Sequence, residues 1–213
     1  MAISYINNAT GLTTATLTGL TQADDIMIGF TFRDGNSTAP TIPAGWTSIS
    51  SSAGTLNNGS CVAWKNATGA AEVSGTWTSA NSLIIDIYRG CDLINPIGTI
   101  AESEGSGSSV ITYPALTCNK SNNTSTVIAF AGHRSPDVNL NNATFTGTSY
   151  TNRAFVQDAT DTAAAHDISS VNSVSSTTQT LTGTNGAWRA RVIELIEAAA
   201  VTNKGSTLSM MGV

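Results

Sequence analysis

A period of two in the apolar residues constrains this chain more than any other feature. Isoleucine or phenylalanine occupies every second position of Ile26–Phe32, and Met, Gly and Thr stand between them. Because successive side chains of a β-strand point to opposite faces, this spacing predicts a strand with one strongly buried face. The same period recurs in Cys61–Lys65, Ser74–Thr78, Ser82–Tyr88, Ser125–Ala131, Arg153–Gln157, Thr177–Thr182 and Trp188–Ile196, and more weakly in Ala15–Leu20, Thr47–Ser52 and Ile111–Leu116.

Turn sequences separate these short strands. Asp34-Gly35-Asn36, Pro43-Ala44-Gly45 and Asn185-Gly186 carry the residues that tight turns require. About ten short strands with turns every 8–15 residues are typical of an all-β protein. We therefore expect an antiparallel, jelly-roll-like β-sandwich.

The two halves of the chain resemble each other. The order of elements is the same in both: an apolar strand, a turn, a strand, an Ala-Thr turn, another strand, and a long apolar strand. Each half has too few strands to bury a core alone, so we expect two pseudo-repeated halves, about 3–118 and 119–200, in a single domain over 1–200. The matching segments are 25–30 with 126–131, 65–70 with 157–162, and 75–82 with 180–187.

Composition narrows the function classes. Only 11% of the 213 residues are charged, nine are Lys or Arg, and the net charge is −5. A nucleic-acid partner is therefore not expected. No apolar run reaches membrane-spanning length, the first residues lack the pattern of a secretory leader, and Cys61, Cys91 and Cys118 lack the spacing of a metal site. We expect reduced cysteines, no cofactor and no metal.

Four landmarks within Asp25–Asp92 carry a family resemblance. They are Pro43–Thr47, Val62–Gly69, Thr76-Trp77 and Ile87–Gly90. In this order they resemble a β-sandwich module of tailed-bacteriophage virion proteins and of some bacterial surface proteins. The resemblance covers about 3–199 and implies a virion location after synthesis in the host cytoplasm, with other virion proteins as partners. It implies no enzyme activity.

Few residues could carry chemistry. Asp86 and Glu194 interrupt comparable apolar strands, and we expect both on a solvated or subunit-facing side, paired with arginines such as Arg89, rather than as a glycosidase pair. We expect Asp24-Asp25 to be solvated turn residues. The acidic loop 158–167 contains three aspartates and His166, and calcium binding there stays open. His133 is expected at a strand end.

Two features favour partner contacts. Trp46 follows a Pro-Ala-Gly turn and is the best candidate for a rim aromatic that stacks on a host glycan, although its position favours capping of the sandwich edge over that role. Residues 201–213 end in four apolar side chains, which we expect to dock on a neighbouring subunit of a homo-oligomer. The four are Leu208, Met210, Met211 and Val213.

The sequence thus favours a non-enzymatic virion structural protein, either a capsid decoration (cement) protein or a tail- or fibre-associated module. The alternative is a carbohydrate-binding adhesin.

Overall fold

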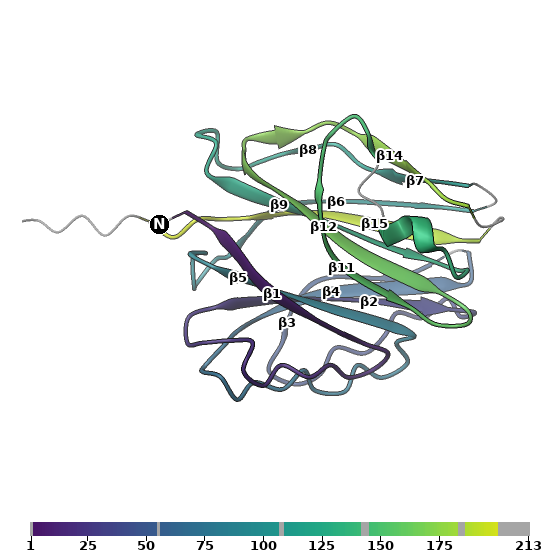
Figure 1. The fold of residues 1–213 in the computed structure, drawn as a ribbon, viewed down its shortest axis with the longest axis horizontal. Helices are drawn as coiled ribbons and strands as arrows, with labels where there is room; N and C mark the ends of the chain where they lie inside the picture. Colours follow the sequence, from purple (N-terminus) through teal and green to yellow (C-terminus); the bar gives the residue numbers. More distant parts are fainter. Residues whose placement is uncertain (1, 55, 107–108, 142–144, 183–185, 200–213) are drawn as a thin grey trace, which may run out of the picture.

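A computed structural model describes residues 2–54, 56–106, 109–141, 145–182 and 186–199 of the chain. Two five-stranded antiparallel sheets face each other across an apolar core (Figure 1). The first sheet contains β1 (Ser4–Gly11), β2 (Ile26–Asp34), β3 (Thr47–Ala53), β4 (Asn58–Asn66) and β5 (Ser82–Arg89). The second contains β6 (Ile97–Gly105), β9 (Ser125–His133), β11 (Thr151–Gln157), β12 (Thr162–Val171) and β15 (Trp188–Leu195). The expected all-β sandwich is confirmed.

The two sheets have the same topology. Their strand orders are β1-β5-β2-β4-β3 and β6-β15-β9-β12-β11. In each, the first strand lies at an edge beside the last, the second lies in the centre, and the third and fourth form a hairpin at the other edge. The pseudo-repeat therefore exists as two equivalent sheets. The chain crosses from one sheet to the other between Arg89 and Ile97, not at the boundary near residue 118 that the sequence suggested.

Equivalent strands show where the sequence matches were out of register. In the central strands, Ile28 and Phe30 face the same core as Ile128 and Phe130, and the rings of Phe30 and Phe130 stack on each other. Residues 28 and 30 therefore correspond to 128 and 130, one position away from the expected match. A slip of one residue moves every side chain to the opposite face. The expected match of 65–70 with 157–162 fails as well, because β4 corresponds to β12 and not to β11.

The inner faces of the two sheets form the central core. Ile28 and Phe30 of β2 pack against Ile128 and Phe130 of β9, and the two phenylalanine rings stack with centroids 5.1 Å apart and an interplanar angle of 9°. Ile84 of β5 joins the same core.

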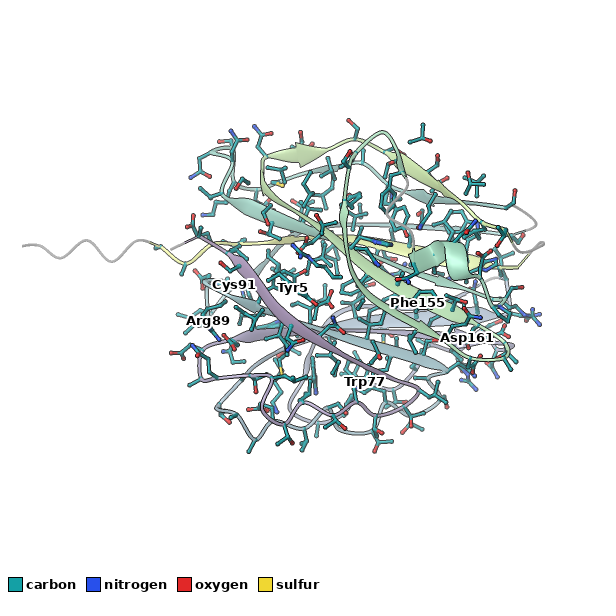
Figure 2. The ribbon with its side chains drawn as sticks, in the orientation of Figure 1. Tyr5, Trp77, Arg89, Cys91, Phe155 and Asp161 are labelled. Carbon is teal, nitrogen blue, oxygen red and sulfur yellow. The ribbon has the colours of Figure 1, made fainter. Side chains whose placement is uncertain are left out.

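Both outer faces are covered as well. Loops between the strands of the first sheet place Leu17 and Trp77 beneath Met27 and Ile85, and Figure 2 labels Trp77 below that sheet. The outer face of the second sheet is covered by β7 (Val110–Tyr113), β8 (Leu116–Thr117), η1 (Val138–Asn141), β10 (Phe145–Thr146), β13 (Ser173–Val174) and β14 (Thr177–Thr180). Figure 1 labels β7, β8 and β14 above this sheet. Since the central strands are covered on both sides, β2, β5, β9 and β15 are buried along almost their whole length.

Some strand predictions were wrong. Ser74–Thr78 and Ala15–Leu20 belong to the covering loops and make only isolated bridges, Thr16 with Val73 and Thr41 with Thr78. The sequence did not indicate β1, β6 or β12. Much of the expected acidic loop is β12, whose alanines at 163–165 are fully buried although alanine is a weak β-former.

Candidate functional site

One side of the sandwich is closed by the Asp86 cluster, which we define as Asp86, Tyr88, Arg153 and Asp167. Its side chains come from β5, β11 and β12 and meet between the sheets. Asp167 accepts hydrogen bonds from Tyr88 Oη (3.0 Å) and Arg153 Nε (2.8 Å). The Arg153 guanidinium lies 4.4 Å from the ring centroid of Tyr5 on the edge strand β1, a cation–π contact (Tyr5 is labelled in Figure 2). The cluster therefore joins the two sheets.

Asp86 is the least satisfied member of this cluster. Its carboxyl is fully buried, and neither oxygen has a hydrogen-bond partner among the described residues. Burial, followed by the nearby Asp167 charge, raises the pKa of Asp86 well above its usual range. Asp86, Tyr88 and Asp167 are at most 1% exposed, so no solute reaches them. The cluster fits an internal link between sheets better than a catalytic site.

Glu194 lies on the opposite side of the second sheet. It accepts hydrogen bonds from the backbone N–H groups of Thr99, Asn119 and Lys120 and from Ser125 Oγ. Burial alone would raise its pKa, but these four donors lower it. Glu194 thus anchors the loop that leads into β9.

Asp86 and Glu194 do not form a pair. The register makes Ile193 the counterpart of Asp86, so Glu194 faces the outer layer while Asp86 faces the central core. The expectation that both lie on a solvated or subunit-facing side is wrong, because both are fully buried. Arg89 pairs instead with Asp25 (2.7 Å), and this ion pair buries Asp25, which we had expected to be solvated.

The other side of the sandwich holds the arginine cavity, about 250 Å³ in volume. It lies between the edge strands β3 and β6, and Arg189 and Arg191 of β15 form its base. Arg189 pairs with Glu104 (2.5 Å) and Arg191 with Glu102 (3.3 Å). Sequence reasoning missed this site, although its signal is present: both the two glutamates and the two arginines are spaced by two, which places each pair on one strand face.

The arginines are fixed from behind by the first sheet. Arg189 Nε donates to Asn58 Oδ1 (3.0 Å), and Arg191 Nη2 donates to Ser60 Oγ (2.9 Å). Ser50 and Ser52 of β3 donate to Glu102. Burial lowers the pKa of Arg191 to about 10, so Arg191 stays charged at neutral pH.

The acidic segment 158–167 does not converge on one point. Asp158 Oδ1 accepts from the backbone of Thr160 and Asp161 and closes the β11–β12 turn. Asp161 accepts from Ser82, and burial raises its pKa to about 7, whereas Asp167 belongs to the Asp86 cluster. Among the described residues, no group of three or more His, Cys, Asp or Glu side chains could hold a metal ion.

Both histidines are buried. His133 ends β9, as expected. His166 on β12 faces the outer layer, where its ring meets Phe145 (4.9 Å between centroids) and Tyr113 (6.1 Å) edge-on. Its ring nitrogens have no partner among the described residues, and burial lowers its pKa to about 3. His166 is therefore a neutral packing residue.

Trp46 caps the loops beneath the first sheet. Its indole N–H donates to the carbonyl of Ser74 (3.0 Å), and its ring meets Trp77 edge-on, with centroids 5.1 Å apart. Its ring is half-buried, so only part of it faces solvent. The capping interpretation of Trp46 therefore describes its contacts better than that of an open stacking platform.

A second opening, the exit hollow, lies where the described chain leaves the sandwich. It measures about 260 Å³ and is lined by residues that include Cys91, Leu93 and Ala198. Leu93 is 38% exposed, and the adjacent Ile94 is 80% exposed. Figure 2 labels Arg89 and Cys91 at this end of the molecule, far from Asp161 at the other. Two apolar residues inside the turn sequence Asp92–Pro96 are the signal that sequence reasoning overlooked.

Residues 201–213, including Leu208, Met210, Met211 and Val213, lie outside the described residues. The described chain nevertheless approaches the exit hollow in a defined way. Glu197 bridges to Cys91, and Ala198 N donates to the carbonyl of Gly90 (2.9 Å).

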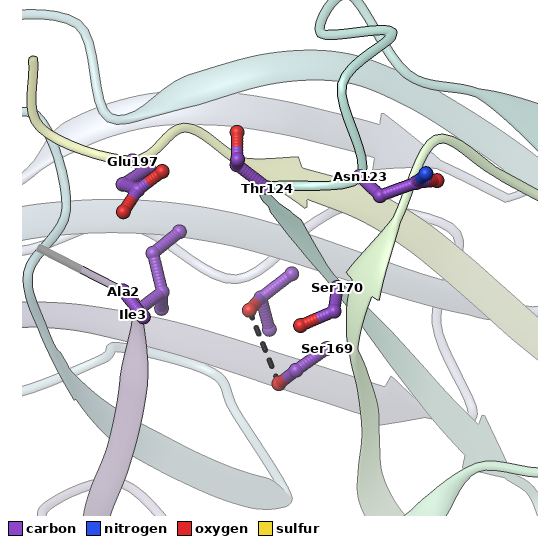
Figure 3. Close-up of a pocket in the computed structure, with 8 residues that line it drawn as sticks. Ala2, Ile3, Asn123, Thr124, Ser169, Ser170 and Glu197 are labelled. Atoms are coloured by element: carbon purple, nitrogen blue, oxygen red, sulfur yellow. Dashed lines mark hydrogen bonds between the residues drawn. The ribbon is translucent and has the colours of Figure 1, made fainter.

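A smaller pocket of about 140 Å³ lies nearby (Figure 3). Hydroxyl side chains and Glu197 line it, and Thr126 and Ser169 hydrogen-bond to each other across it (3.2 Å). It brings together no group of reactive residues.

In the described part of the chain, no helix has the length and apolar character needed to cross a membrane. No protein-family model, curated protein or solved structure matches the chain.

Proposed function

We propose that this protein is a non-enzymatic structural component of a tailed-bacteriophage virion. It acts as a surface decoration protein or a tail- or fibre-associated module that stabilises neighbouring subunits. The sequence resemblance to virion β-sandwich modules supports this proposal. The doubly covered sandwich, whose two sheets are joined on two sides by side-chain hydrogen bonds, is suited to a rigid building block.

The exit hollow is the observation that carries the proposal. Ile94 exposes most of its side chain beside an apolar hollow, at a point where Ala198 leads the chain out of the sandwich. Exposed apolar surface of this kind marks contact sites. We assign its occupant as residues 201–213 of a neighbouring copy. Leu208 lies nine positions after Ala199, enough to span roughly 30 Å when extended, so these apolar side chains can reach beyond their own subunit.

Removal of residues 201–213 tests the docking step, since the truncated chain keeps every described strand. Sedimentation should show an oligomer for the full chain and monomers after truncation. Ile94→Asp should have the same effect, because it places a charge in the contact. Val73→Asp, at a site in the covering loops that is 68% exposed, should leave assembly intact. An unchanged mass with a lower melting temperature would instead place the segment on its own subunit and contradict the assignment.

The virion location is tested by antibody labelling of intact particles in the electron microscope. Evenly labelled heads support the decoration role, and label at the tail supports the tail or fibre role. Unlabelled particles whose protein extract also lacks the chain would reject a virion location.

A further inference from the structure

We propose that the arginine cavity is a binding site for a neutral saccharide, which it holds through hydroxyl groups. This inference does not depend on the virion proposal, and it places the ligand at a site other than Trp46. The cavity combines two properties that a hydroxyl-rich ligand needs: fixed donors and acceptors, and a balanced charge.

The donors are fixed in advance. Arg189 and Arg191 are only 4% and 1% exposed, and groups of the first sheet hold their guanidinium planes from behind. Arg189 Nη2 also donates to the carbonyl of Ala53 (3.3 Å), while its Nη1 has no hydrogen-bond partner among the described residues. A guanidinium carries five N–H donors in a rigid, planar group. The side chain of Arg189 is already ordered before a ligand binds, so binding through its N–H groups costs little conformational entropy.

The acceptors lie at the mouth. Glu102 and Glu104 are about one-third exposed, at 36% and 35% of their side chains, and belong to the edge strand β6. A carboxylate accepts up to about four hydrogen bonds. Glu102 already accepts from Ser50 and Ser52 and pairs with Arg191, which leaves room for one more hydrogen bond from a sugar hydroxyl. Sugar hydroxyls both donate and accept, which matches this mixed set of groups.

The charge balance selects the ligand class. The two arginines and two glutamates that line the cavity cancel in formal charge. The glutamates would repel an anionic ligand and the arginines would repel a cationic one, so a charged ligand gains no net electrostatic attraction. The volume of about 250 Å³ lies below the range of roughly 300–1,000 Å³ typical of drug-sized ligands, which favours a single sugar ring.

Two adjacent serines of β3 provide a matched test. Ser52 lines the cavity, whereas Ser51 is exposed and points to the other face of the same strand. The probes are neutral hexoses and N-acetylhexosamines, with glucuronic and N-acetylneuraminic acids as charged comparisons. Saturation-transfer NMR on the full chain should show saturable binding of at least one neutral sugar. Ser52→Trp should weaken it at least tenfold and Ser51→Trp less than twofold.

Glu104→Gln supplies a second variant that keeps the shape of the cavity. It leaves one unmatched arginine charge, so binding of the neutral sugar should weaken while the two acidic sugars gain affinity. Absence of saturable binding up to about 20 mM neutral sugar would overturn the proposal. So would a neutral-sugar signal that survives both Ser52→Trp and Glu104→Gln, or a wild-type preference for the acidic sugars.

Discussion

Phe30 and Phe130 stack on each other at the centre of the sandwich, and they occupy equivalent positions in the two sheets. The two sheets are therefore related by a pseudo-two-fold axis, which passes between β2 and β9. The edges follow the same relation: β1 lies beside β11, and β6 lies beside β3. Both open sides are closed by polar contacts, but with unrelated residues.

The stacked pair should be a principal source of stability. Phe130→Ala removes a fully buried ring and leaves a cavity between two sheets that cannot collapse freely, so we expect a loss of about 3–5 kcal/mol in the free energy of unfolding. Urea denaturation measures it. Val73→Ala, at a side chain that is 68% exposed, should change the free energy by less than about 0.5 kcal/mol. Similar losses in both variants would contradict the central role of the pair.

Gly132 shows how the same axis is filled. The equivalent residue in the first sheet is Phe32, which faces Gly132 across the core. A methyl group at Gly132 would overlap the ring of Phe32, so this ring fills the space beside both residues. Gly132→Ala should therefore destabilise the protein by about 1–3 kcal/mol through overpacking. Gly69→Ala is the matched control, because a methyl group there meets nothing within 4 Å. A neutral Gly132→Ala variant would show that the ring can move aside.

The sequence predicted the sandwich and most of the long strands because period-two patterning is a local signal. It could not provide the register, since the matches between halves were weak enough to slip by one residue. That slip made Asp86 and Glu194 look equivalent, although Ile193 is the counterpart of Asp86. The sequence also did not predict the layers that cover the outer faces of the sheets. These layers bury the outward-facing residues of each strand, which are exposed to solvent in an uncovered sheet. The arginine cavity requires β3, β6 and β15 to meet, which is long-range information.

Asp86 should make the protein less stable as pH rises. Its folded pKa lies above that of the unfolded chain, so its stabilising contribution is complete below about pH 4 and is lost as pH rises towards the folded pKa. The loss is at most about 1.4 kcal/mol per pH unit. Asp86→Asn should remove this slope. Urea midpoints from pH 4 to 8 measure it, and the difference from wild type cancels the similar contribution of Asp161, whose pKa is about 7. Parallel curves for the two proteins would refute the raised pKa.

Glu194 should behave in the opposite way. Its folded pKa is lowered, so its contribution is present above about pH 4.5 and is lost as pH falls through the folded pKa. Glu194→Gln places an amide NH₂ among four donors, and we expect a loss of about 1–3 kcal/mol at pH 7 that shrinks in acid. The same urea series measures it. A gain in stability at neutral pH would contradict the anchoring role of Glu194.

His166 should account for part of the loss of stability in acid. The pKa of His166 is about 3 in the folded protein and about 6.5 in the unfolded chain. As pH falls below 6.5, the imidazole is therefore protonated in the unfolded chain but stays neutral in the folded protein. Between pH 6.5 and 4.5 this costs about 2–3 kcal/mol. His166→Phe keeps a ring against Phe145 and Tyr113 and should recover most of that loss at pH 4.5. His133→Phe should have the same sign but a smaller effect, because burial lowers the His133 pKa while Asp137 and Asp34 oppose the shift. If His166→Phe unfolds in acid along the wild-type curve, then protonation of His166 does not limit stability there.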